Sequence, residues 1–135
     1  MKKITPINPK SLRQPTKSYS QGLLVPLGNA DILFVTGQVA QDINGEVVAP
    51  NDAKAQTELI YARIADILTD AGMSMDDVVK AQIFLTDIAD GPIVSTIRDQ
   101  VFKVAKPVST LVEVRNLVKP GCCVEIEIIA VKLKE

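Results

Sequence analysis

The sequence contains no histidine and no tryptophan, and its 135 residues include only two cysteines, Cys122 and Cys123. Without histidine the chain cannot use Ser-His-Asp or Cys-His catalysis, an imidazole general base or histidine-ligated zinc. The two cysteines are adjacent, and neighbours on a strand point to opposite faces, so they are poor candidates for a redox or chelating pair. We expect one of them in the core and the other exposed. Any catalysis must use carboxylates, hydroxyls, backbone N–H groups, arginine or lysine.

Aromatic residues and net charge are also scarce. Two tyrosines and three phenylalanines offer little surface for stacking the bases of single-stranded nucleic acid. A net charge of −1 gives no electrostatic footprint for duplex nucleic acid or an anionic membrane. No apolar run approaches transmembrane length, and the N-terminus lacks the apolar region of a signal peptide. We therefore expect a cytoplasmic protein with no membrane partner, for which nucleic acid is an improbable ligand.

Length and composition fit one domain over residues 1–135, since 47% apolar and 23% charged residues are typical of a soluble globular chain. Residues 1–16 hold three prolines and predict an irregular lead-in. Residues 19–25 predict a short strand. Residues 31–39 are apolar on both faces as far as Thr36-Gly37-Gln38, which predicts a strand covered on both sides.

Two helices are predicted. The first begins at Asn51 or Asp52 as N-cap and ends near Ala71, before a C-cap glycine at Gly72. The second covers about residues 91–105, with Asp90 as a possible cap. Their expected buried stripes are, for the first, Ile60, Ile64, Ile67, Leu68 and Ala71 and, for the second, Ile93, Ile97, Val101 and Val104.

Three more strands complete the pattern. Residues 77–87 alternate, with Val79, Ala81, Ile83 and Leu85 on one face. Residues 108–114 and 124–133 follow, joined through the Lys119-Pro120-Gly121 turn. The order ββαβαββ predicts an α+β fold with a mixed sheet and both helices on one face.

The other sheet face is predicted to carry apolar residues beside polar ones, including Phe34 or Val35 and Phe84. An uncovered half-apolar face implies a partner, and a symmetric homo-oligomer is the most economical one. The last strand also places Glu125 and Glu127 together on one face. Two carboxylates on an apolar strand need solvent, a partner or a function.

Five segments follow one another in a recognisable order and spacing between residues 19 and 131. They are YSQG at 19–22, FVTGQ at 34–38 with NGEV at 44–47, DVVK at 77–80 with TD at 86–87, PVSTLVEV at 107–114, and VEIE at 124–127. Together they resemble the RidA/YjgF family, also called the L-PSP or reactive intermediate deaminase family.

That resemblance implies a chorismate-mutase-like subunit and a homotrimer with three clefts at the subunit interfaces. Each cleft of the active deaminases hydrolyses a 2-imino or enamine acid to a 2-keto acid and ammonium, without a metal or an organic cofactor. An arginine in the P-x-R strand grips the carboxylate of the substrate, a task suited to the fork geometry of guanidinium. The first glutamate of the last motif positions water.

Carried over residue by residue, the resemblance places Glu125 as the water-positioning residue. The ligand-binding residues implied by the other motif positions are Tyr19, Thr36, Gly37, Ser95, Ser109 and Leu111. Ser109 stands where the family has its arginine, and losing such a contact should cost about 2–5 kcal/mol. Arg98, one turn beyond Ser95, is a possible substitute anchor, and Arg115 is a second one.

Each of these residues also has a plainer interpretation. Glu125 can be a solvated carboxylate, Gly37 a strand glycine at a bulge, and Tyr19 a packing residue. Arg98 and Arg115 can be ordinary surface arginines.

Three functions remain. The first is a trimer that binds a small carboxylate-bearing metabolite and deaminates imino acids. The second is a binding or regulatory protein without catalysis. The third, ribonuclease activity, fits poorly because the chain lacks histidine, a metal cluster and a basic track.

Overall fold

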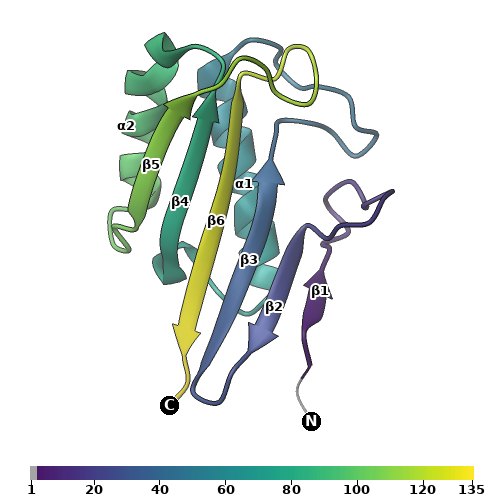
Figure 1. Ribbon diagram of the computed structural model, residues 1–135, viewed down its shortest axis with the longest axis vertical. Coiled ribbons are helices and arrows are strands. Elements are labelled where there is room, and N and C mark those ends of the chain that lie inside the picture. Colours follow the sequence, from purple (N-terminus) through teal and green to yellow (C-terminus); the bar gives the residue numbers. More distant parts are fainter. Residues whose placement is uncertain (1–2) are drawn as a thin grey trace.

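The computed structural model describes residues 3–135 as one six-stranded sheet with both helices packed on the same face (Figure 1). The strand order is β1-β2-β3-β6-β4-β5, and every neighbouring pair is antiparallel except β4 and β5. The elements are β1 (Thr5–Ile7), β2 (Gly22–Pro26), β3 (Ala30–Gln38), α1 (Ala53–Asp70), β4 (Val78–Leu85), α2 (Gly91–Val101), β5 (Val108–Glu113) and β6 (Val124–Leu133). The predicted α+β class, mixed sheet and one-sided helix layer are confirmed.

The expectation of an irregular lead-in was wrong for residues 5–7, and residues 1–2 lie outside the described part. Thr5–Ile7 forms β1, which pairs with β2 at the edge of the sheet. A proline is tolerated at an edge because the missing N–H leaves no central ladder bond unmade. Ile7 is buried against the core, which holds this short strand in place.

The last strand, β6, lies between β3 and β4 and forms the middle of the sheet. Its alternation is as predicted: Val124, Ile126 and Ile128 are buried beneath the helices, while Glu125 and Glu127 lie on the opposite, open face. The position of β6 thus brings both carboxylates to the centre of the open face.

The first helix confirms its predicted caps and stripe. The Asp52 side chain accepts a hydrogen bond from the Ala55 backbone N–H at 3.0 Å. Ile60, Ile64 and Ile67 are fully buried between α1 and the sheet. Gly72, with φ of +75°, follows the helix in the left-handed conformation that glycine adopts readily.

The second helix confirms half of its predicted stripe, since Ile97 and Val101 pack against the core. Val94 is its buried residue, whereas Ile93 is exposed and Val104 lies beyond the helix end, 65% exposed. Phe102, just after α2, packs edge-on against Tyr61 of α1, with ring centroids 5.5 Å apart. The inward face of α2 is therefore formed by Val94, Ile97 and Val101, and Phe102 continues it beyond the helix end.

Asp90 occupies the predicted N-cap position of α2, but its side chain makes no cap hydrogen bond. Asp87 caps the preceding short turn instead, by accepting from the Ala89 N–H.

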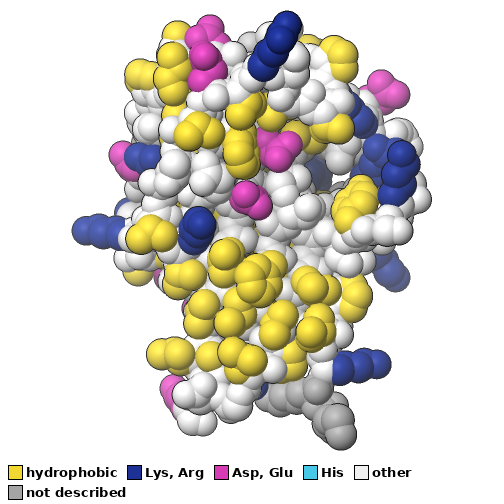
Figure 2. Space-filling view, in the orientation of Figure 1, with side chains coloured by type: hydrophobic (Ala, Val, Ile, Leu, Met, Phe, Trp, Pro, Cys, Tyr) yellow, Lys and Arg dark blue, Asp and Glu magenta, His cyan; other side chains and the backbone are white. Residues whose placement is uncertain are grey.

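The open face of the sheet is half apolar, and no other part of residues 3–135 covers it. Phe34, rather than Val35, points to this face and is 45% exposed, so β3 is covered on one side only. A register shift between Val78 and Lys80 turns Val79 outward, contrary to its predicted place on the buried face. Figure 2 shows hydrophobic side chains gathered over the lower half of this face, with acidic groups above them.

Both cysteines are buried, which corrects the expectation that one would be exposed. They precede β6 instead of lying on it, so strand alternation does not separate them. The Lys119-Pro120-Gly121 turn is confirmed, because Gly121 has φ of +91° and the Cys122 N–H donates to the Lys119 carbonyl at 3.2 Å. Among residues 3–135, no helix has the length and apolar character needed to cross a membrane.

Candidate functional site

The strand β3 carries a bulge at its Thr36-Gly37 step, where its register with β6 shifts between Val35 and Gln38. The carboxylate of Glu125 on β6 lies directly against Gly37. A Cβ atom placed on Gly37 would overlap the Oε2 atom of Glu125 and come within 2.8 Å of its carboxyl carbon. Glycine at position 37 therefore leaves space for the Glu125 carboxylate in this position, and its φ is not in the positive range.

Glu125 is half-buried, and burial raises the pKa of its carboxyl group. The negative charge of Glu127, two residues along the same face of β6, raises that pKa further. A carboxyl group with a raised pKa can exchange a proton closer to neutral pH than an exposed one. That property suits general acid–base chemistry.

A hollow of about 350 Å³ opens beside Glu125 and contains four of the predicted site residues. Tyr19, Thr36, Gly37 and Glu125 all line it, although they come from the segment before β2, from β3 and from β6. The structure thus brings together the motif residues of three separate segments.

Two cationic residues that we did not predict line the same hollow. Arg13 comes from the lead-in between β1 and β2, and Lys119 from the turn before β6. The Lys119 Nζ atom donates to the Oε1 atom of Gln41 at 3.2 Å and to the carbonyl oxygen of Gly45. No periodic pattern marks Arg13 in the sequence, because its place depends on tertiary contacts.

Two buried glutamines from the recognised motifs connect this lead-in to β3. Gln38 donates from its Nε2 atom to the Oε1 atom of Gln21 at 2.8 Å, and Gln21 donates to the carbonyl oxygen of Arg13 at 3.0 Å. Both glutamine side chains are buried, so these bonds satisfy polar groups that have no access to bulk water. Both glutamines belong to motifs that are visible in the sequence. No sequence pattern, however, indicated that they hold the backbone of Arg13.

A third buried glutamine, Gln56 of α1, fixes the loop that leads into β6. Its Nε2 atom donates to the carbonyl oxygens of Val48, Ala49 and Gly121, the last at 2.8 Å. Its Oε1 atom accepts from the Cys123 backbone N–H at 2.9 Å. Gln56 thereby sets the start of the strand that carries Glu125.

The remaining predicted site residues lie at the other edge of the sheet. Ser109 on β5 and Arg98 on α2 line a separate hollow of about 400 Å³. The Arg98 Nη1 atom lies 3.5 Å from the Ser109 hydroxyl, and its Nε and Nη2 atoms contact the Asp99 carboxylate at 3.1 and 3.0 Å. Ser95 is partly exposed on α2, and Leu111 packs against the core. Within this chain these four residues do not meet Glu125.

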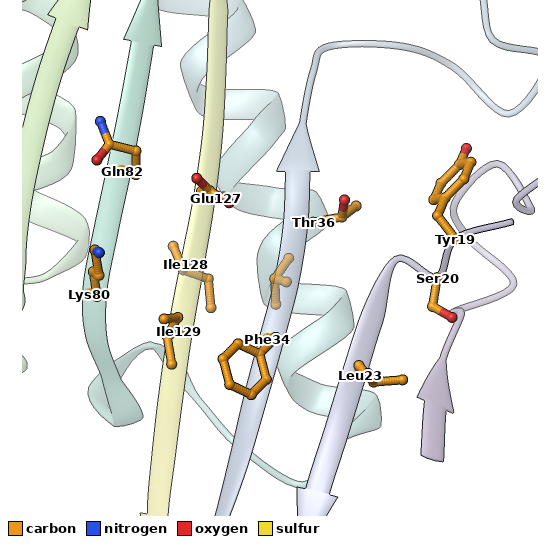
Figure 3. A pocket seen from close by; sticks show the side chains of 11 residues that line it. Tyr19, Ser20, Leu23, Phe34, Thr36, Lys80, Gln82, Glu127, Ile128 and Ile129 are labelled. Carbon is orange, nitrogen blue, oxygen red and sulfur yellow. The ribbon is translucent and has the colours of Figure 1, made fainter. Parts of the chain in front are cut away.

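A third hollow, of about 500 Å³, occupies the open sheet face and adjoins the Glu125 hollow through Tyr19 and Thr36. Figure 3 shows Glu127 of β6 between Gln82 of β4 and Thr36 of β3, with Phe34 and Ile129 below. Its apolar floor fits an intermolecular contact better than a site for chemistry. Among residues 3–135, no cluster of three or more acidic or cysteine side chains is able to hold a metal ion.

Comparisons with known proteins identify the family of this chain. The family model described as endoribonuclease L-PSP matches residues 10–132. The 3-aminoacrylate deaminase RutC of Acinetobacter baylyi is 39% identical over 107 residues, which cover 78% of this chain and 84% of the relative.

Solved structures give the same result. The Rid family protein YyfA of Yersinia pestis superposes with a TM-score of 0.84 at 33% identity, covering 95% of this chain and 98% of that one. TdcF of E. coli, solved with bound serine, superposes with a TM-score of 0.80 at 30% identity and covers 95% and 98% of the two chains. The motifs, the fold and these relatives agree, and the chain belongs to the RidA/YjgF family of L-PSP-type proteins.

Proposed function

We propose that this protein is a homotrimer that binds a small carboxylate-bearing metabolite in clefts between subunits, and that it hydrolyses 2-imino or enamine acids to 2-keto acids and ammonium. The observation that carries the proposal is the hollow in which Glu125 lies against Gly37, beside Thr36 and Tyr19. These are the positions that the family resemblance assigns to water and substrate.

The relatives support this class of ligand. One is described as a deaminase of 3-aminoacrylate, an enamine acid, and another holds serine. Both molecules are small, carry one carboxylate and bear an amino group. Ligands of this class also fit the size of the hollow beside Glu125, which is about 350 Å³.

The chemistry requires one water molecule and proton transfers. Protonation of the enamine carbon gives an iminium ion, and water adds to the iminium carbon with loss of one proton to form a carbinolamine. Loss of ammonia then forms the keto group. Glu125 can accept a proton from the attacking water and return it to the departing nitrogen, and its raised pKa favours both transfers near neutral pH.

The trimer is proposed because an apolar open face needs cover and because Ser109, Arg98 and Glu125 lie apart within one chain. Sedimentation should give a mass near three times the 14.6 kDa subunit. Phe34→Asp on the open face should reduce that mass, while Val104→Asp, on an exposed site after α2, should not. A wild-type monomer at micromolar concentration would contradict the assembly.

A coupled assay tests the activity. A pyridoxal enzyme acting on serine or threonine supplies the enamine, and release of the 2-keto acid is followed with and without the protein. Acceleration that disappears in Glu125→Gln supports the proposal. No acceleration over the uncatalysed rate, even at high protein concentration, would contradict the enzyme function.

One observation favours a second candidate, a binding or regulatory protein without catalysis. Ser109 replaces the arginine that grips the substrate in the family, and a hydroxyl cannot make a charge-assisted pair. Shifts in melting temperature with keto acids and amino acids, in the absence of turnover in the coupled assay, would favour this candidate.

A further inference from the structure

The hollow beside Glu125 contains two cations that no carboxylate neutralises. Within the part of the chain that the structure describes, neither Arg13 nor Lys119 forms an ion pair. Arg98, the substitute anchor expected from the sequence, is paired with Asp99 at 3.0 Å instead. Lys103 and Lys106 also line the Ser109 hollow, but Arg13 and Lys119 are the cations that share a hollow with Glu125 in the described part of the chain.

Arg13 is held at its backbone, while its side chain has no hydrogen-bond partner among residues 3–135. Leu12, its neighbour, is buried in the core, and Gln21 donates to the Arg13 carbonyl at 3.0 Å. The guanidinium group lies against Gly45, where an added Cβ atom would overlap it. A fixed backbone with an uncommitted guanidinium is suited to gripping an anion, because little of the chain must be ordered on binding.

Lys119 is positioned by neutral acceptors only. Its Nζ atom donates to the Gln41 side chain and the Gly45 carbonyl, which hold the ammonium in place without cancelling its charge. An ammonium has three donors, so one remains for a ligand.

Arg13, Lys119 and Glu125 line the same hollow, and among the described residues no ion pair joins either cation to Glu125. A hollow of about 350 Å³ has room for a small metabolite beside these three side chains.

We propose that Arg13 and Lys119 bind the carboxylate of the ligand, in place of the arginine that this chain lacks at position 109. The inference rests on the proposed function for the nature of the ligand. It names an anchor on the same chain that supplies Glu125, and it predicts selectivity for acids over their neutral amides.

The direct test is calorimetric titration with 2-ketobutyrate, compared with its neutral amide. The variants are Arg13→Gln, Lys119→Gln and the double variant, with Lys17→Gln as a control of equal charge change on an exposed site of the same lead-in. Arg13→Gln should weaken binding of the acid by roughly 30-fold, as expected for removal of one member of a desolvated charge pair. The affinity of Lys17→Gln for 2-ketobutyrate should stay within about twofold of the wild-type affinity. The wild type should bind the neutral amide no more tightly than the double variant binds 2-ketobutyrate.

Arg13→Gln is the decisive variant, because its side chain makes no bond that folding needs in the described residues. An unchanged affinity in that variant would overturn the inference, and so would a wild type that binds neither 2-ketobutyrate nor pyruvate. Circular dichroism and melting of Lys119→Gln check that losing its contacts leaves the fold intact.

The coupled deaminase assay separates this inference from the proposed function. If the wild type binds 2-ketobutyrate through Arg13 but does not hydrolyse the enamine, the anion site stands and the catalytic proposal falls. If Arg13→Gln keeps the wild-type rate and KM, the anion site falls and the deaminase remains.

Discussion

The carboxylate of Glu125 occupies the space that any side chain on Gly37 would need. The contact joins the bulge of β3 to the open face of β6, two strands that are adjacent in the sheet but distant in sequence. It explains why the two motifs occur together. One supplies a carboxyl group, and the other supplies the only residue type that lets this group lie flat against the backbone.

Gly37→Ala should therefore affect the site more than the fold. The new methyl group would overlap a flexible carboxylate, so Glu125 moves aside and the core is little changed. We expect a loss of turnover or ligand affinity of at least about tenfold, equivalent to about 1.4 kcal/mol. Gly28→Ala is the matched control, because nothing lies within 4 Å of an added Cβ there. Equal activity of the two variants would show that the position of Glu125 does not matter.

Glu125→Gln should change how stability depends on pH. The folded-state pKa of Glu125 is raised above its ordinary value of 4.5, so the native state binds more protons than the unfolded state just above that pH. Wild-type stability consequently falls as pH rises through this window, and the glutamine variant should not share that fall. Denaturant unfolding of both proteins, at equal protein concentration and at pH 4.5 and pH 8, measures the difference in their free energies of unfolding. Relative to the wild type, Glu125→Gln should have a larger free energy of unfolding at pH 8 than at pH 4.5. The control Glu135→Gln, at an exposed site, should not show this gain.

Ser109→Arg alone should restore little of the affinity for the substrate carboxylate that the family's arginine provides. The Arg98 Nη1 atom lies 3.5 Å from the Ser109 hydroxyl, so a second guanidinium would meet a like charge. Arg98→Gln combined with Ser109→Arg removes that repulsion and should bind 2-ketobutyrate more tightly than either single variant. A double variant with unchanged affinity and fold would indicate that this edge of the sheet takes no part in binding.

Gln56→Met should destabilise the protein by about 3 kcal/mol or more. The substitution keeps the size of the side chain but leaves the carbonyl of Gly121 and the N–H of Cys123 without their buried partner. Gln100→Met, at an exposed site on α2, provides the control. Thermal or denaturant melting gives the comparison, and equal stability of the two variants would contradict the role assigned to Gln56.

Local patterns predicted most of the fold. The period of two in β6, the caps of α1 and the glycine turns each depend on neighbouring residues, and all are confirmed. The errors arose where distant contacts decide the outcome. The inward face of α2 is set by packing of Phe102 on Tyr61, and β1 exists because β2 offers it an edge.

Some residues of the candidate site could be predicted from the sequence, and others depend on distant contacts. Motif order was sufficient to group Tyr19, Thr36, Gly37 and Glu125, which the structure places in one hollow. Arg13 was missed because nothing in the lead-in marks it. Its position depends on Gln21 and Gln38, which join segments 17 residues apart in the sequence.

The central place of β6 has a consequence for the folding order. Among the strands of residues 3–135, only β6 hydrogen-bonds to both β3 and β4, so without it the described halves β1-β2-β3 and β4-β5 share no strand pairing. A chain emerging from the ribosome would therefore hold two partial sheets with unpaired edges until residues 124–133 have been made. Closing that gap is a long-range step, and it should set both the folding rate and the period in which the nascent protein is most prone to aggregate.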